Sequence, residues 1–223
     1  MHYKLVVFDW DGTLMDSEAQ IISCMQSAFT DLQLQPPSRD QVRNIIGLGL
    51  REAVSQLHAT ADEAMIERLF ERYRHHFFAE HSPKADLFPG VEACLEELSQ
   101  AGYLLAVATG KGRRGLDLVL DQTGLGDYFI ATRCADETFS KPHPQMLQEL
   151  IDFAGVSATE AVMIGDTEYD LQMAINAGSP SIAVSYGVHT TERLLRFNPL
   201  ACLDAIDQLP ACMHNLPPCS TSR

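Results

Sequence analysis

The chain has 223 residues, of which 46% are apolar and 21% are charged, a balance typical of a folded globular protein and unlike that of a disordered one. Its 30 acidic residues against 16 basic ones give a formal net charge of −14, which disfavours binding to the phosphate backbone of a nucleic acid. The first apolar run, Leu5 to Phe8, is far too short to cross a membrane. Six scattered cysteines without a C-x-x-C pair predict reduced thiols. We expect a cytoplasmic protein without nucleic-acid or membrane partners, and a monomer or a weak homodimer.

The first part of the chain combines one short strand with helical patterns. Leu5 to Phe8 reads as a buried strand, and a helix is expected to begin near Ser17, because apolar residues then recur on one helical face. Capping boxes at Ser38–Gln41 and Thr60–Glu63 predict the starts of a short and a long helix. No convincing strand pattern occurs between residues 16 and 83. We predict that residues 16–83 form a helical insertion after the first strand, which we call the cap.

From residue 84 onward, short apolar strands alternate with helices. Strands are predicted at Leu104–Ala108, Tyr128–Ala131, Ala161–Ile164 and Ser181–Val184. Helices are predicted near residues 91–100, 112–123, 144–153 and 168–176. Such alternation is typical of a parallel sheet covered by helices on both faces. The predicted fold is an α/β protein with a Rossmann-like parallel sheet core, residues 1–15 and 84–215, the inserted all-helical cap, and a mobile tail, residues 216–223.

Acidic residues directly follow two of the predicted strands. Asp9 and Asp11 come after the first strand, and Asp166 follows a later one, with Asp170 four residues further on. Ligands of open α/β sheets bind at the carboxyl ends of the strands, so we expect these carboxylates to converge there. Clustered carboxylates repel each other, and a hard divalent cation such as Mg²⁺ relieves that repulsion through oxygen ligands. Taken singly, Asp11 with Gly12 favours a simple turn, and Asp166 and Asp170 are compatible with acids at a helix N-terminus.

Four short motifs resemble those of a known family. The sequence D-W-D-G-T at residues 9–13 resembles the D-x-D-G-T motif of the haloacid dehalogenase-like superfamily. Thr109, Lys141 with the proline that follows it, and G-D-T-E-Y-D at residues 165–170 resemble the second, third and fourth motifs. All four occur in the family's order, and the resemblance covers roughly residues 4 to 210.

The resemblance implies a role for each matching residue. Asp9 attacks phosphorus and forms an aspartyl-phosphate, and Asp11 first protonates the leaving oxygen and then deprotonates the attacking water. Thr109 and the backbone N–H of Gly110 hydrogen-bond the transferring phosphoryl oxygens. Lys141 neutralises developing charge and holds the nucleophile.

The resemblance also implies a metal site. Asp9 and Asp166 ligate Mg²⁺ through their side chains, Asp11 ligates it through its carbonyl oxygen, and Asp170 supports or joins this set. The residue after the second-motif threonine is often asparagine in related phosphatases, whereas this chain has Gly110. An amide side chain is lost there while the backbone N–H is kept.

The predicted cap resembles that of phosphoglycolate phosphatases and β-phosphoglucomutases, and is more similar to the former. Such a cap closes over the site and contributes to specificity. The loop at residues 46–51 is the best candidate for facing the substrate, with Arg51 pairing with a second anionic group. The alternative, that Arg51 is a solvated helix residue, is equally compatible with the sequence.

The leading functional hypothesis is a Mg²⁺-dependent phosphatase acting on a small-molecule phosphate ester such as phosphoglycolate. A phosphomutase on the same scaffold is the first alternative. A 2-haloacid dehalogenase is disfavoured by Asp11, because related dehalogenases lack this second aspartate. A phosphoacceptor switch domain that uses Asp9 is a further alternative, disfavoured because Asp11 promotes turnover and a large cap is superfluous for a switch.

Overall fold

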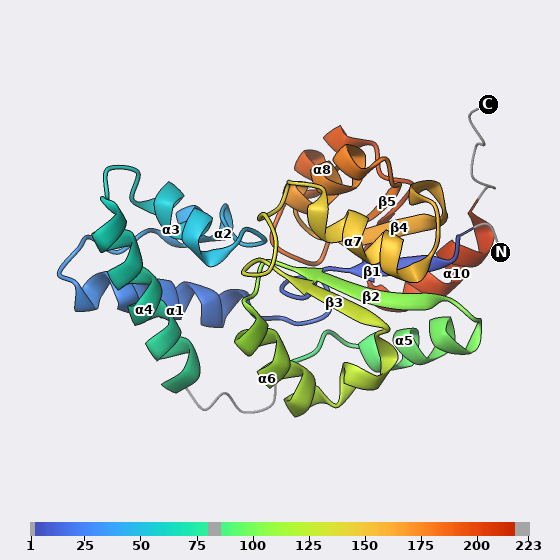
Figure 1. The fold of residues 1–223 in the computed structure, drawn as a ribbon, viewed down its shortest axis with the longest axis horizontal. Coiled ribbons are helices and arrows are strands. Elements are labelled where there is room, and N and C mark those ends of the chain that lie inside the picture. The colour runs from blue at the N-terminus through green and yellow to red at the C-terminus, as the bar shows by residue number, and fades with distance from the viewer. Residues whose placement is uncertain (1–2, 80–85, 217–223) are drawn as a thin grey trace.

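A six-stranded parallel sheet forms the centre of the molecule in the computed structural model, which describes residues 3–79 and 86–216 (Figure 1). Its strands are β1 (Leu5–Phe8), β2 (Leu104–Thr109), β3 (Ala131–Cys134), β4 (Ala161–Gly165), β5 (Ser181–Val184) and β6 (Cys202–Leu203). They lie in the order β3-β2-β1-β4-β5-β6, and each neighbouring pair is parallel. The strand order therefore reverses direction beside β1, the point where ligands bind in such sheets.

Helices cover both faces of this sheet, as the alternation of side chains along the strands requires. Val6 and Phe8 of β1 pack in one apolar cluster, and Leu5 and Val7 pack in another. The first face is covered by α5 (Val91–Gln100), α6 (Arg113–Thr123) and α10 (Leu209–Asn215). The second is covered by α7 (Gln145–Ala154) and α8 (Glu168–Ala177), with α9 (Thr191–Leu194) beyond them. The fold predicted from the alternating pattern is confirmed.

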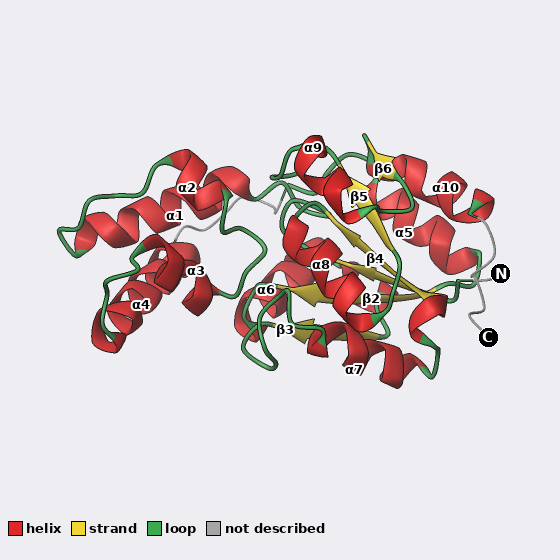
Figure 2. Ribbon diagram, turned by 90° about the horizontal axis from the view of Figure 1, so that it is seen from above, coloured by secondary structure: helices red, strands yellow, loops and turns green. Residues whose placement is uncertain are grey.

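The segment between β1 and α5 folds as helices with an apolar cluster of their own. Figure 2 shows them set to one side of the sheet. They are α1 (Glu18–Asp31), α2 (Arg39–Arg43), α3 (Leu50–Leu57) and α4 (Glu63–Ala79). Buried side chains such as Met25, Val54 and Leu69 join these helices to each other. The boundary expected between residues 83 and 84 lies outside the described residues, so the exact limits of the cap stay a prediction.

Two sequence expectations about local structure are wrong. The strand expected at Tyr128–Ala131 begins at Ala131, because Leu125–Tyr128 forms a 3-10 helix and Tyr128 packs into the core from there. This edge strand is only partly buried, so it lacks the apolar run that marks β1 and β4. The capping box expected at Thr60 does not form, since the Met65 N–H donates instead to the Asp62 carboxylate at 2.8 Å. The box at Ser38 is confirmed.

Among the described residues, no helix is long and apolar enough to cross a membrane. Four of the cysteines in that part of the chain, Cys94, Cys134, Cys202 and Cys212, are free thiols. The tail predicted to be mobile, residues 216–223, lies outside the described residues except for Leu216.

Candidate active site

The predicted site residues converge at the carboxyl ends of the central strands. Asp9 directly follows β1, Thr109 is the last residue of β2, and Asp166 directly follows β4. The backbone N–H of Asp9 donates to the carbonyl of Ile164 at 2.9 Å, which continues the β1–β4 ladder into the site. Residues more than 150 positions apart in the sequence are therefore held together by the register of two neighbouring strands.

Lys141 lies between two carboxylates of the site, those of Asp9 and Asp170. Its ammonium nitrogen is 2.8 Å from Asp9 Oδ1 and 2.6 Å from Asp170 Oδ1, and all three side chains are buried. Burial lowers the pKa of Lys141, but Asp170 and Asp9 together raise it beyond its usual range, so the side chain stays charged. Lys141 thus compensates part of the negative charge, but a single cation cannot balance Asp9, Asp166 and Asp170 together.

Asp166 is fixed by donors from two loops. Thr13 Oγ1 donates to Asp166 Oδ1 and the Val188 N–H donates to Oδ2, both at 2.8 Å. Gly12, with a φ of +83°, makes room for this carboxylate, because a Cβ there would lie 2.2 Å from Asp166 Oδ2. The glycine of D-W-D-G-T is therefore required by the close approach of the first and fourth motifs as well as by its turn.

The three inner carboxylates can hold a hard cation. Asp9, Asp166 and Asp170 each offer an oxygen within 4.8 Å of the others. Burial and the neighbouring acids raise the pKa of Asp9 well above its usual value, and burial with Asp170 raises that of Asp166 to about 7. Neither buried oxygen of Asp9 accepts a hydrogen bond of good geometry from the described residues, despite the close Lys141 ammonium. A buried oxygen without a donor, set among like charges, fits a divalent metal ion.

Asp11 has different partners and faces the cavity. Ser17 Oγ donates to Asp11 Oδ1, and Lys111 Nζ lies 2.9 Å from the same oxygen. Lys111 was missed by the sequence reasoning, which treated the residues after Thr109 only as backbone donors. It is 9% exposed, because its ammonium also lies 4.9 Å from the centre of the Phe77 ring of the cap. The feature of the sequence that could have pointed to Lys111 is its position two residues after the end of β2.

Gly110 lies where the cap meets the core. A Cβ at this position would lie 2.5 Å from the carbonyl oxygen of Leu48 and 2.8 Å from that of Gly47. The loop before α3 therefore packs against the bare backbone of Gly110, and the Ser140 hydroxyl accepts the Gly49 N–H at 2.8 Å on the same side. The side chain that related phosphatases often carry at position 110 has no space in this arrangement.

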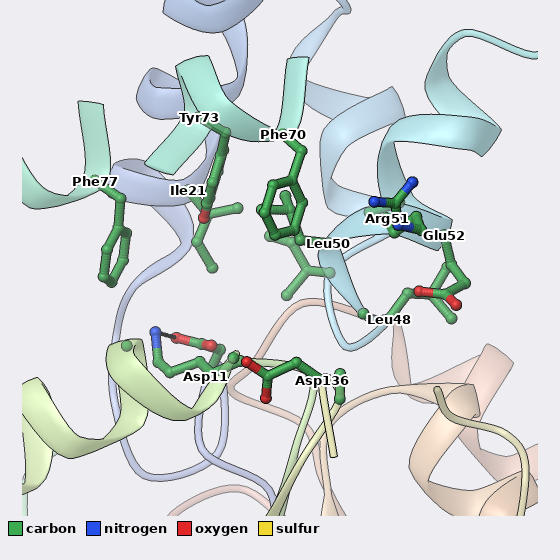
Figure 3. A pocket seen from close by; sticks show the side chains of 18 of the residues that line it. Asp11, Ile21, Leu48, Leu50, Arg51, Glu52, Phe70, Tyr73, Phe77 and Asp136 are labelled. Atoms are coloured by element: carbon green, nitrogen blue, oxygen red, sulfur yellow. Dashed lines mark ion pairs between the residues drawn. The ribbon is translucent and has the colours of Figure 1, made fainter. Parts of the chain in front are cut away.

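A cavity separates the cap from the site floor (Figure 3). Asp11 and Gly110 line its core side, and Arg51 lines its cap side. The Arg51 guanidinium forms ion pairs with Glu63 and Glu67 of α4. Arg51 thus lines the cavity, but two carboxylates within the cap already compensate its charge.

The loop whose Val188 N–H donates to Asp166 also contains His189, which should make the stability of the fold depend on pH. His189 Nδ1 accepts the Glu168 N–H at 3.0 Å, and burial together with Arg193 lowers the pKa of His189 from 6.5 to about 4. The unfolded chain therefore binds a proton that the folded chain excludes, so this contribution is complete above pH 6.5 and is lost as the pH falls to about 4. The expected loss is at most about 3 kcal/mol in the free energy of unfolding.

Urea unfolding of the metal-free protein at pH 7 and pH 4.5 measures this loss. The His189→Gln variant should lose less stability between the two pH values than the parent, since contributions from the other groups cancel in the comparison. The exposed His75 provides the matched control, and His75→Gln should behave as the parent does. Equal pH dependence of all three proteins would contradict the expectation.

The chain matches the model of a family described as haloacid dehalogenase-like hydrolase over residues 6–184. It is 35% identical over 222 residues to "Probable phosphatase IndB" of Dickeya dadantii (strain 3937), with 98% of this chain and 96% of that protein covered. It is 33% identical over 218 residues to a phosphoglycolate phosphatase of Agrobacterium fabrum (strain C58 / ATCC 33970), with coverages of 95% and 93%. The crystal structure of a predicted phosphatase from Clostridium acetobutylicum has a TM-score of 0.87 at 27% identity, with coverages of 97% and 100%.

The fold and these matches define a hydrolase with an α/β core and a helical cap. The chain belongs to the haloacid dehalogenase-like hydrolase family. The resemblance stated from the four motifs is confirmed, and so is the expectation that the chain is an enzyme of the phosphatase type.

Proposed function

We propose that the chain is a Mg²⁺-dependent phosphatase that hydrolyses a small-molecule phosphate monoester through an aspartyl-phosphate on Asp9. The observation that carries this proposal is the state of Asp9, a buried carboxylate at the floor of a cavity. Its Oδ1 lies 2.8 Å from the Lys141 ammonium, and its Oδ2 has no hydrogen-bond donor among the described residues. A carboxylate oxygen without a hydrogen-bond donor keeps its lone pairs available for attack on an electrophile. The ammonium of Lys141, 2.8 Å away, holds its position.

The reaction proceeds in two displacements. An Asp9 oxygen attacks phosphorus, the bond from phosphorus to the ester oxygen breaks, and Asp11 gives its proton to the departing alcohol. Asp11 then takes a proton from water, whose oxygen attacks the same phosphorus. The bond between phosphorus and Asp9 breaks, which releases phosphate and restores the carboxylate.

The charge on the transferring group is stabilised by residues around it. Lys141 supplies a positive charge, and the Thr109 hydroxyl and the Gly110 N–H supply donors for the phosphoryl oxygens. Asp11 is held ready for proton transfer by Ser17 and Lys111, which contact one of its two carboxylate oxygens and leave the other for the substrate.

The metal would be held by Asp9, Asp166 and Asp170, with the carbonyl of Asp11 as a further ligand. Mg²⁺ suits such a set because it prefers carboxylate and carbonyl oxygens. When bound, it neutralises the carboxylates and the phosphoryl dianion, which otherwise repel each other. The donor set and the raised pKa values of Asp9 and Asp166 support this assignment.

Phosphate release from a panel of esters, with Mg²⁺ and with a chelator, tests the proposal. We expect release that requires Mg²⁺ and that weakens as the pH falls below about 7, because protons then compete with the metal for Asp166. The panel includes phosphoglycolate, which the name of a relative suggests. No release from any ester, or equal release in the chelator, would contradict the proposal.

The same products decide between the alternatives. A phosphomutase yields an isomerised sugar phosphate in place of free phosphate, and a switch domain keeps a phosphorylated Asp9 without turnover. The role of Arg51 stays a prediction, which requires that Arg51→Ala raises the KM for an ester with a second anionic group. The expected monomer or weak homodimer, the cytoplasmic location and the lack of nucleic-acid or membrane partners also stay predictions.

The packing of the cap loop on Gly110 gives a test of cap closure. A Gly110→Ala side chain would force Leu48 away, because its Cβ would lie 2.5 Å from the Leu48 carbonyl oxygen. We expect kcat/KM to fall by about tenfold to a hundredfold, since small displacements near a reacting group have effects of that size. Gly126→Ala is the matched control, because no atom lies within 4 Å of its added Cβ. Unchanged kcat/KM in Gly110→Ala would show that the loop does not close in this way.

A further inference from the structure

The cavity above the site floor is larger than a two-carbon ester requires. Its volume is about 390 Å³, and Asp9 and Asp11 line one end of it. At about 30 Å³ per water molecule, this is the volume of about a dozen waters. A substrate that fills it must carry a substantial group on the ester oxygen, beyond the phosphate that sits against the aspartates.

The wall facing the aspartates is apolar and largely aromatic. Phe70, Tyr73 and Phe77 point from α4 into the cavity, and Ile21 and Leu50 border it from α1 and α3 (Figure 3). The rings of Tyr73 and Phe77 are stacked, with their centres 6.1 Å apart and an angle of 16° between their planes. Apolar surface of this kind binds an apolar body and offers little to a carboxylate.

Among the described residues, the cations nearest the floor already have acidic partners. Lys141 pairs with Asp9, and Lys111 pairs with Asp11 at 2.9 Å. Arg51 pairs with two glutamates of the cap. A second anionic group bound close to the floor would have to displace one of these pairs.

Two further arginines lie beside aromatic rings of α4. Arg74 lies 5.4 Å from the centre of the Phe70 ring, and Arg114 lies 4.1 Å from that of Phe78. Both line the cavity, and both line a shallower hollow that adjoins it. On a protein with a net charge of −14, such a pair can attract an anionic ester toward the opening. Their position suits the approach of the phosphate.

We propose that the substrate of this enzyme is the phosphate monoester of an alcohol that carries an apolar ring, and that Phe70, Tyr73 and Phe77 bind this ring. This inference rests on the phosphatase function proposed above and specifies its substrate class. The phosphate lies against Asp9, while the ring lies under α4 and excludes water from the reacting atoms. The wall formed by Phe70, Tyr73 and Phe77 thus favours a ring-bearing alcohol over glycolate.

Two esters that differ only by a ring provide the test. The parent enzyme is assayed with 2-phenylethyl phosphate and with ethyl phosphate, whose alcohols leave with similar ease, and with phosphoglycolate. Burial of one aromatic ring predicts that kcat/KM for the phenylethyl ester exceeds that for the ethyl ester by about tenfold to a hundredfold. It should also exceed the value for phosphoglycolate.

Variants of Phe70 locate the preference. Phe70→Ser should reduce the ratio of the two kcat/KM values by about fivefold or more, and Phe70→Leu should keep most of it, because leucine restores apolar surface. Phe153 on α7 is 62% exposed and lies outside the cavity, so Phe153→Ser is the matched control and should leave the ratio unchanged. Phe70 is only partly buried, and the Leu variant verifies that a changed ratio does not reflect misfolding.

The outcomes separate the two proposals. If the enzyme hydrolyses all three esters but prefers phosphoglycolate or treats the phenylethyl and ethyl esters equally, the inference about the ring is wrong and the phosphatase function stands. If it hydrolyses none of the three with Mg²⁺, both proposals fail. If the Phe70→Ser variant keeps the full preference for the phenylethyl ester, the ring does not bind against this wall.

Discussion

Replacement of Asp9 by asparagine should slow phosphate release by about four orders of magnitude or more, because the amide oxygen is a weak nucleophile and cannot form the acyl phosphate. Loss of a covalent nucleophile has effects of this order in other hydrolases. The measurement is steady-state kcat on the best ester of the panel, at saturating Mg²⁺.

Thermal unfolding in a chelator provides the control for this variant. Burial and neighbouring acids raise the pKa of Asp9, so its ionised form costs free energy in the metal-free folded protein. Asn at position 9 removes that cost, and the Tm of the metal-free variant should not fall below that of the parent. Activity lost together with stability would mean that the substitution damages the fold, and retained activity would mean that Asp9 is not the nucleophile.

Replacement of Asp11 by asparagine should lower kcat by about a hundredfold to ten-thousandfold for an ester of an aliphatic alcohol, because general acid–base catalysis contributes to both displacements. The rate of the first displacement should fall much less for an ester of an acidic phenol, because the phenol oxygen leaves without a proton. Rapid mixing that follows the release of the phenol should therefore show a burst in the variant, as the covalent enzyme accumulates.

Ser17→Ala serves as the companion variant. Ser17 Oγ donates to Asp11 but does not replace it as an acid, so this variant should show a moderate loss and no burst. An Asp11→Asn enzyme that slows equally for both kinds of ester, without a burst, would place the function of Asp11 elsewhere, such as in the shape of the metal site.

The convergence of the acids was predictable from sequence because it depends on local pattern and one rule of topology. Asp9 follows an uninterrupted apolar strand, and so does Asp166, with the intervening Gly165. Parallel strands bring such positions to one edge of the sheet whatever their separation in the chain. Thr109 also follows a predicted apolar strand, but it carries no charge that would mark it, and Lys141 follows no predicted strand directly. Only the family resemblance singled these two residues out.

The contacts between the cap and the core were not predictable in the same way. Lys111 reads as a solvated loop lysine until α4 places Phe77 over it. The helix period puts Glu63 and Glu67 on one face of α4, but nothing in the sequence shows that this face docks beside Arg51. The glycine at position 110 likewise acquires its meaning only from the approach of another loop.

The two edge strands of the sheet, β3 and β6, were also hard to predict from the sequence. The core strands are buried on both faces and read as apolar runs, whereas β3 is partly buried and β6 has two residues. Short edge strands are stabilised by pairing with a neighbour more than by their own composition, so a pattern of side chains cannot locate them. These errors lie away from the site and leave its prediction intact.

Chemical trapping of the covalent intermediate tests the central claim most directly. The Asp11→Asn enzyme is mixed with Mg²⁺ and a phenol ester, reduced with borohydride, and digested for mass spectrometry. Borohydride reduces an acyl phosphate to an alcohol, so the account predicts homoserine at position 9, formed only when the ester is present. An unmodified Asp9 under conditions where phenol is released, or a reduced carboxylate at another position, would contradict it.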